Sequence, residues 1–179
     1  MEVVARWELD EAFGEDDVIV MDYELTGEFG AAPLDRRVLA YVGLPRRVGS
    51  IFTTEVVGSP ELFAVREFEL AGGNKSVLAL GGPPDDERMR FFLDLQEGFV
   101  VLISFHEGGA QAEIVNSSLD DFVEFLYRFG LRDKDLSGAS IEEDRQYTAG
   151  FVEVLKEFDP FAFSQPDSWW SMAIDRIKK

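Results

Sequence analysis

The chain has 179 residues, of which 35 are Asp or Glu and 17 are Lys or Arg, so its formal net charge is −18. This charge argues against nucleic-acid binding, which usually requires a basic patch that contacts the phosphates. An acidic field attracts basic proteins, although a surface that merely keeps the protein soluble explains the charge slightly better when charge is considered alone. The absence of cysteine excludes disulfides, thiolate catalysis and every cysteine-ligated metal site.

Hydrophobic residues make up 46% of the chain and aromatic residues 13%, which are values of a folded globular protein. At this length we expect a single domain, residues 1–179. No apolar run reaches the roughly eighteen residues of a membrane span, so we expect none. The N-terminal residues Met1-Glu2-Val3-Val4 lack the basic region of a signal peptide, and we therefore expect a cytoplasmic protein.

The first half of the chain is predicted to contain one helix and several short strands. A short strand is expected over residues 17–21, after a turn at Gly14, and a helix over residues 33–42, which Gly43 ends. Leu44-Pro45 then forces an extended exit. Three further strands are predicted over residues 50–57, 63–70 and 75–80, with Gly72-Gly73-Asn74 as a hairpin loop, and residues 81–87 form an acidic loop.

The clearest pattern runs from Arg90 to Phe129. Two apolar segments flank Gln96-Glu97-Gly98, which predicts a tight hairpin whose turn Asp94 orders. A third strand near residues 111–115 leads into a helix that begins at Ser118, where Asp121 stands in the capping-box position. Gly130 is predicted to end that helix.

Two more helices are predicted toward the C-terminus. One begins near Ser140, with Glu143 as its capping-box partner, and ends at Asp159-Pro160; the other begins near Asp167 or Ser168. Helical spacing turns one of Trp169 and Trp170 toward the core and leaves the other half-exposed. Together the elements predict an α+β fold: one mainly antiparallel sheet of five or six strands with helices packed on one side.

No catalytic set of residues emerges from the sequence. His106, the one histidine, stands at the end of a predicted strand with no nucleophile or orienting partner, and is interpreted as an exposed loop residue. No glycine motif for phosphate binding is present. The many carboxylates give no reason to select a catalytic pair, so a carboxylate- or metal-dependent hydrolase is the least favoured alternative.

Residues 133–144 resemble a calcium-binding loop, with Asp133 and Asp135 in its first half and Asp144 at its twelfth position. However, Leu136 is apolar where a polar residue is usual, and Asp144 replaces the bidentate Glu. We therefore favour a polar turn between two helices, in which Ser140 caps the second helix, and we predict no metal and no cofactor.

Three stretches of the chain resemble a known protein family. They are R-R-V-L-A-Y-V-G-L-P-R-R-V-G at residues 36–49, the pair F-F-L-D-L-Q-E-G-F-V-V-L-I and I-V-N-S-S-L-D-D-F-V-E-F-L at 91–103 and 114–126, and D-P-F-A-F with S-W-W-S-M-A-I-D-R-I within 159–177. In this order they resemble the SUKH superfamily of bacterial immunity proteins, which is related to Smi/Knr-type regulators, and most closely its fourth family. Residues 1–30 carry no such resemblance.

The resemblance implies an α+β sheet-and-helix fold and a non-enzymatic protein that binds and neutralises a cognate toxin of a polymorphic toxin system, often a nuclease or nucleic-acid deaminase. The residues that match the family pattern each have a structural reason, as a turn, an extended exit, a hairpin or a helix start. They are Gly43, Leu44, Pro45, Asp94, Gly98, Asn116, Ser118 and Phe122.

Because toxins of this kind are commonly basic at their active cleft, the resemblance gives the negative charge a role in binding. We expect a monomer or weak homodimer that binds a basic protein toxin and binds neither nucleic acid nor membrane. The alternative is a regulatory or scaffold module on the same fold that binds another protein. The predicted partner-binding residues are Asp85, Asp86 and Glu87, followed by Glu142, Glu143 and Asp144.

Overall fold

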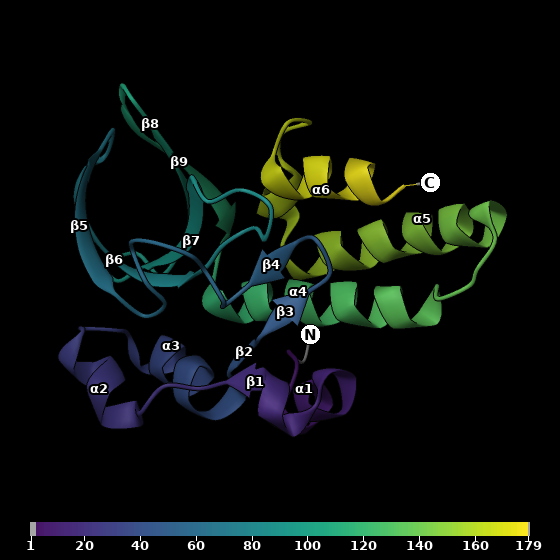
Figure 1. Cartoon of the computed structure of the whole chain (residues 1–179), viewed down its shortest axis with the longest axis horizontal. Coiled ribbons are helices and arrows are strands. Elements are labelled where there is room, and N and C mark those ends of the chain that lie inside the picture. Colours follow the sequence, from purple (N-terminus) through teal and green to yellow (C-terminus); the bar gives the residue numbers. More distant parts are fainter. Residues whose placement is uncertain (1–2, 179) are drawn as a thin grey trace.

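A computed structural model describes residues 3–178 of the protein. Its five-stranded sheet is curled and lies on one side of the molecule, at the left of Figure 1. The strands follow the same order along the chain and across the sheet, and every neighbouring pair is antiparallel. The prediction of a single α+β domain with an antiparallel sheet of five or six strands is confirmed. The strands are β5 (Val65–Leu70), β6 (Gly73–Gly81), β7 (Met89–Asp94), β8 (Val100–His106) and β9 (Gly109–Asn116).

Both faces of the central strands are buried, which explains why their sequences are almost continuously apolar. Side chains on the outer face of the curl, such as Leu78 and Phe91, join the main core beneath the helices. Alternate side chains, such as Val77 and Phe92, form a second and smaller core on the concave face. The period of two along each strand thus supplies two separate cores.

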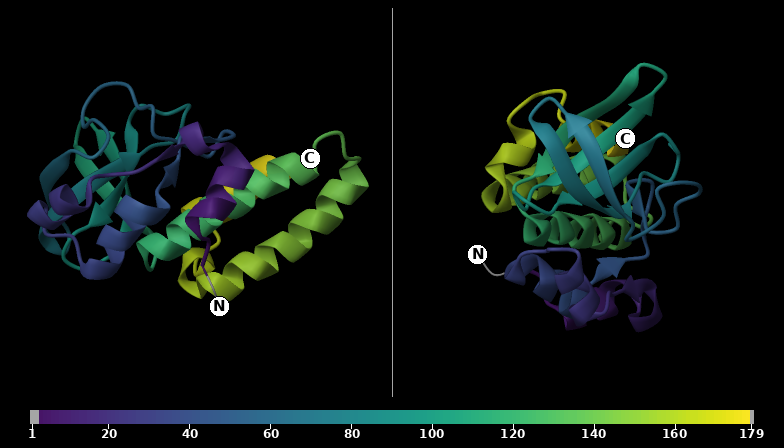
Figure 2. Two further views of the ribbon diagram at one scale, coloured as in Figure 1. Left: turned by 90° about the horizontal axis from the view of Figure 1, so that it is seen from below. Right: turned by 90° about the vertical axis from the view of Figure 1, so that its left-hand side faces the viewer.

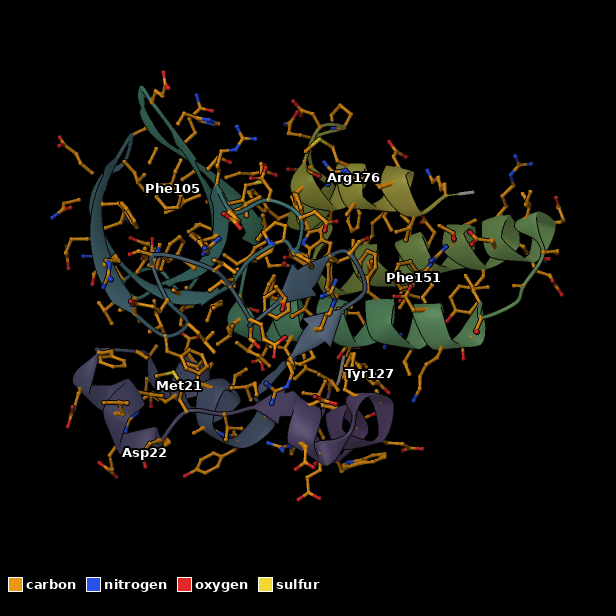
Figure 3. The ribbon with its side chains drawn as sticks, in the orientation of Figure 1. Met21, Asp22, Phe105, Tyr127, Phe151 and Arg176 are labelled. Carbon is orange, nitrogen blue, oxygen red and sulfur yellow. The ribbon has the colours of Figure 1, made fainter. Side chains whose placement is uncertain are left out.

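The concave core is closed by the sheet itself. The ring of Phe68 on β5 lies 5.6 Å from the ring of Phe92 and 5.7 Å from that of Phe105. Figure 3 shows Phe105 inside the curl, facing away from the helices. No helix among the described residues covers this face, so the predicted placement of helices on one side of the sheet is confirmed.

Three α-helices and the short helix η3 pack on the outer face around an aromatic core. The ring of Phe122 lies 5.2 Å from Phe91 of the sheet, and the rings of Phe125 and Phe129 each lie 5.2 Å from Trp170. Figure 3 shows Phe151 in the same layer, between two helices. The elements are α4 (Leu119–Asp135), α5 (Ile141–Phe158), η3 (Pro160–Phe163) and α6 (Trp169–Ile177).

Residues 3–45 form a layer of short elements along α4, here called the N-terminal layer, which lies at the bottom of Figure 1 and of the right-hand view in Figure 2. Leu9 and Met21 of this layer belong to the main core. Its elements are α1 (Arg6–Phe13), η1 (Glu15–Asp17), β1 (Val18–Ile19), α2 (Tyr23–Glu28), α3 (Pro33–Arg37), η2 (Val38–Val42) and β2 (Leu44–Pro45). A small ladder of β3 (Arg47–Val48) and β4 (Phe52–Thr53) connects the layer to the sheet.

The expectation that one of the two adjacent tryptophans is half-exposed is wrong, because only 3% of Trp169 and 0% of Trp170 is exposed. Helix α6 contacts both the sheet and α4, so it has packing partners on two sides. Trp169 packs edge-on against Phe91 at 5.6 Å, whereas Trp170 stacks on Phe129 of α4. The sequence shows one apolar face, but the tertiary structure buries both neighbouring side chains.

The predicted end of α4 at Gly130 is also wrong, since the helix continues to Asp135. The ring of Phe13 from α1 occupies the space where a side chain at position 130 would lie. Gly130 is therefore required for close packing between α1 and α4, and does not end the helix.

Other boundaries differ from those predicted. The strand expected over residues 50–57 is reduced to Phe52–Thr53, because the chain beyond it is held by the buried guanidinium of Arg90, which donates to the carbonyls of Val57 and Pro60. The strand expected over residues 17–21 comprises only Val18–Ile19, and the β5–β6 loop is residues 71–72. The helix predicted over residues 33–42 is present, but its second half winds as a π-helix.

Candidate protein-binding surface

The residues that carry the family resemblance take structural positions. Gly43 has a φ of 92°, and a side chain there would lie 2.7 Å from the carbonyl oxygen of Ile19. This close approach lets Leu44-Pro45 pair with β1. Leu44 then enters the main core, where 1% of it is exposed.

Asp94 orders the β7–β8 turn. Its Oδ1 accepts hydrogen bonds from the backbone N–H groups of Gln96 at 2.9 Å and Glu97 at 3.0 Å. Gly98 completes the turn with a φ of +78°, in the left-handed region that favours glycine. The ammonium of Lys75 bridges this turn from β6, 3.6 Å from Asp94 and 3.5 Å from Glu97.

A buried polar network links β9, α4 and α6 through Asp159, the residue that ends α5. Asp159 accepts hydrogen bonds from the side chain of Asn116 at 3.1 Å and from the backbone and hydroxyl of Ser117 at 2.7 and 2.8 Å. Asn116 in turn accepts one from the indole Nε1 of Trp170 at 2.9 Å. Ser118 caps α4, whose Phe122 is fully buried. This network joins the N-S-S and D-P pieces of the sequence in space.

The predicted acidic residues of the β6–β7 connection are accessible. Asp85 and Glu87 are exposed, and Asp86 is partly exposed. Asp86 accepts hydrogen bonds from the backbone and side chain of Arg88, and these contacts, the backbone one foremost, hold the pKa of Asp86 below its usual value. The loop therefore presents a carboxylate cluster in which one member is already paired with a cation.

The three residues of the second predicted cluster all lie in the first turn of α5, but they differ in exposure. Glu142 and Glu143 are exposed, and Glu143 closes a capping box with Ser140, whose hydrogen bonds lower the pKa of Glu143. The expectation that Asp144 is exposed is wrong, because it is 3% exposed and lies 2.8 Å from the guanidinium of Arg132 on α4. Asp144 thus holds two helices together and is hidden from a partner.

The segment that resembles a calcium loop is the junction between α4 and α5. Asp133 and Asp135 lie in the last turn of α4, where Asp135 accepts a hydrogen bond from the hydroxyl of Tyr147 at 2.9 Å. Ser140 caps α5, as predicted. Within residues 3–178, no group of three or more His, Cys, Asp or Glu side chains could hold a metal ion. His106 is exposed at the end of β8.

Sequence patterns gave no functional role to residues 1–30, yet this part of the chain is rich in acidic residues. The first 29 residues contain ten Asp or Glu and one Arg, a net charge of −9, which is half of the total. Trp7 of α1 is 65% exposed beside this charge. A count of charge by segment could have revealed this region from sequence. The exposed carboxylates among the described residues of this segment are Glu11, Glu15, Asp16, Asp17, Asp22, Glu24 and Glu28.

Other carboxylates are buried and serve the fold. Glu124 on α4 is 1% exposed, accepts the backbone N–H of Val4 at 2.6 Å and pairs with Arg128 at 2.6 Å. Its pKa is raised by burial. Burial and the nearby Asp120 carboxylate raise the pKa of Asp35 to about 6.

Two hollows adjoin the edge strand β9. An apolar groove of about 640 Å³ opens on the concave face, lined by Leu70, Phe99, Val101, Ala112 and Ile114 among others. A second hollow of about 490 Å³ lies between β9 and the η3–α6 segment, with Glu113, Phe161 and Asp167 in its wall. Ala112 and Ile114 line both hollows, so the two meet along the strand.

The fold and these surfaces define a single α+β domain with acidic faces and an open sheet edge. The family model described as SUKH-4 immunity protein matches residues 4–176. The chain therefore belongs to the SUKH-4 immunity protein family, as the sequence resemblance indicated. The matched range includes most of the first thirty residues, in which no motif pointed to the family.

Neither a curated protein nor a solved structure matches the chain at a significant level. Within the described residues, no helix is both long and apolar enough to cross a membrane. Family membership supports an immunity role and a toxin as partner, and it favours a protein that acts by binding over one that acts as an enzyme.

Proposed function

We propose that this protein neutralises a cognate toxin by binding it directly in the cytoplasm, as a monomer or weak homodimer without catalytic activity. Membership of the immunity protein family over residues 4–176 is the observation that carries the proposal. A net charge of −18 supports a basic partner, such as a nuclease or nucleic-acid deaminase whose cleft binds phosphates.

The charge acts at long range in this proposal. Complementary fields speed the encounter of two proteins, whereas desolvated contacts set the lifetime of the complex. The first 29 residues carry half of the net charge, and the exposed indole of Trp7 beside them is of a kind that is enriched in binding hot spots. The clusters Asp85-Asp86-Glu87 and Glu142-Glu143 add to the field from other elements.

The first test is co-expression with the toxin domain encoded beside this gene. The proposal predicts that growth is rescued and that a one-to-one complex co-purifies. Absence of both rescue and complex would contradict it and favour a regulatory module that binds another protein.

The location of the binding surface is tested by charge reversal in three sets: Asp85, Asp86 and Glu87; Glu142 and Glu143; and Glu24 and Glu28. Charge reversal of the set nearest the toxin should lower the association rate about tenfold at low salt and leave the dissociation rate nearly unchanged. Lys156→Glu on α5 provides a control that increases the negative charge. Unchanged association in all three sets would refute steering by these carboxylates.

A further inference from the structure

Among the described residues, one edge of β9 has no strand paired with it. Strand β9 pairs with β8 alone there, and its other side lies near η3, α6 and β5, with a hollow between the strand and the η3–α6 segment. Figure 1 shows β9 at this border, with the yellow C-terminal elements beside it. Exposed edge strands present unpaired N–H and C=O groups, to which an extended chain can add.

The two hollows suit the geometry of an added strand, whose successive side chains point to opposite faces of the sheet. The groove on the concave face is mostly apolar, with Leu70, Phe99 and Val101 in its wall, although Lys75, Asp94 and Glu97 also line it. The second hollow contains the carboxylates of Glu113 and Asp167. One face of the edge therefore accepts apolar side chains, and the other accepts cations.

We propose that the open edge of β9 binds an extended segment of a protein partner in which apolar and basic side chains alternate. The inference rests on the proposed function in assigning that segment to the toxin. Only a polypeptide supplies both the backbone groups that pair with the strand and the alternating side chains that fill the two hollows. Ile114 and Phe161, 37% and 47% exposed, provide apolar surface that the segment covers.

The charge of the second hollow supports a basic residue in the segment. Glu113 accepts the backbone N–H of Trp169 at 2.6 Å, which fixes its carboxylate at the start of α6. Burial is the largest influence on the pKa of Glu113 and raises it. The hydrogen bond from the Trp169 N–H lowers this pKa, whereas the nearby Asp167 carboxylate raises it. A Lys or Arg between the two carboxylates relieves their repulsion.

The test uses the whole purified protein and blocked, fluorescent peptides of about eight residues that alternate Val with Lys or Val with Glu. Fluorescence anisotropy measures binding to the wild type, to Ala112→Trp and to Ala149→Trp. Ala112 is exposed in the groove, so the tryptophan side chain of Ala112→Trp fills the groove without changing the net charge. Ala149 is exposed on α5, in a helix that packs away from the open edge.

The Val–Lys peptide should bind the wild type and Ala149→Trp equally, and should bind Ala112→Trp about tenfold more weakly. Equal binding to all three would show only general attraction to an acidic protein and would overturn the proposal. Asp167→Lys, an exposed substitution that keeps the groove, should shift preference about tenfold from Val–Lys toward Val–Glu. An unchanged preference would likewise overturn it, even if Ala112→Trp failed to fold.

The same variants, mixed with the neighbouring toxin domain, separate the two proposals. If the wild type binds no toxin but binds Val–Lys through the groove, the toxin-binding function fails and the peptide site stands. If toxin binds wild type and Ala112→Trp equally, the function stands and this edge is not its docking site.

Discussion

Asp35 offers a direct test of the electrostatics of this fold. It lies in the first turn of α3, is 8% exposed, and has a pKa raised from 3.8 to about 6 by burial and then by Asp120. Replacing it with Asn keeps the shape of the side chain and removes the charge. We therefore expect Asp35→Asn to be more stable than the wild type at neutral pH.

The magnitude follows from the shift in pKa. The folded state holds the proton more tightly than the unfolded state, so wild-type stability is full below pH 3.8 and falls until the pH exceeds about 6. A shift of this size, at about 1.4 kcal/mol per pKa unit, corresponds to about 3 kcal/mol at pH 7. Loss of a carboxylate from the first turn of a helix offsets about 0.3–1 kcal/mol of that gain.

Urea denaturation of both proteins between pH 4 and pH 8 measures this difference. The advantage of Asp35→Asn should be near zero at pH 4, grow through pH 5–6 and level off near 2 kcal/mol above pH 7. Asp85→Asn, in an exposed loop, serves as control and should change stability by less than about 0.5 kcal/mol. A difference that does not vary with pH would refute the assignment of a buried, repelled carboxylate at position 35.

Three further predictions concern packing and buried polar contacts. Gly150→Ala on α5 should stabilise the protein by about 0.5–1 kcal/mol in urea denaturation, because no other atom lies near the added methyl group. Gly130→Ala should destabilise the protein by about 1 kcal/mol in the same assay, because the Phe13 ring must move. Equal effects of the two substitutions would contradict the close contact between Gly130 and Phe13. Arg132→Met should lower the free energy of unfolding by about 3–5 kcal/mol, because it leaves the Asp144 carboxylate buried without its cation. The double variant with Asp144→Leu should recover most of that stability. No recovery would argue against a buried ion pair. Trp170→Phe should lower the free energy of unfolding by about 2–4 kcal/mol, because it removes the hydrogen bond to Asn116 and leaves a cavity. Thermal and urea unfolding measure this change. A loss below about 1 kcal/mol would show that the network tolerates the substitution.

Local signals in the sequence were reliable where neighbouring residues decide the structure. Ser118 and Ser140 cap their helices because each hydroxyl accepts a hydrogen bond from the backbone N–H three residues further along the chain. Asp94 orders its turn for the same reason, through contacts two and three residues away. The central strands β6, β7 and β8 were found because continuous apolar runs mark strands that are buried on both faces.

The errors concern contacts between elements that are distant in the sequence. Gly130 resembled a helix end, but the ring of Phe13 from the N-terminal layer gives it a packing role. Asp144 resembled an exposed acid, but Arg132 on the preceding helix buries it. In each case the partner comes from another element, and the packing of those elements is not encoded in local spacing.

The sequence by itself determined the β7–β8 hairpin, the starts of α4, α5 and α6, the acidic character and the family, because these depend on short-range patterns and composition. The tertiary structure alone decided that both Trp169 and Trp170 are buried and that β9 keeps an open edge between two hollows. Those features arise from the curl of the sheet and the position of α6 beside it, which bring together residues more than fifty positions apart, such as Glu113 and Trp169.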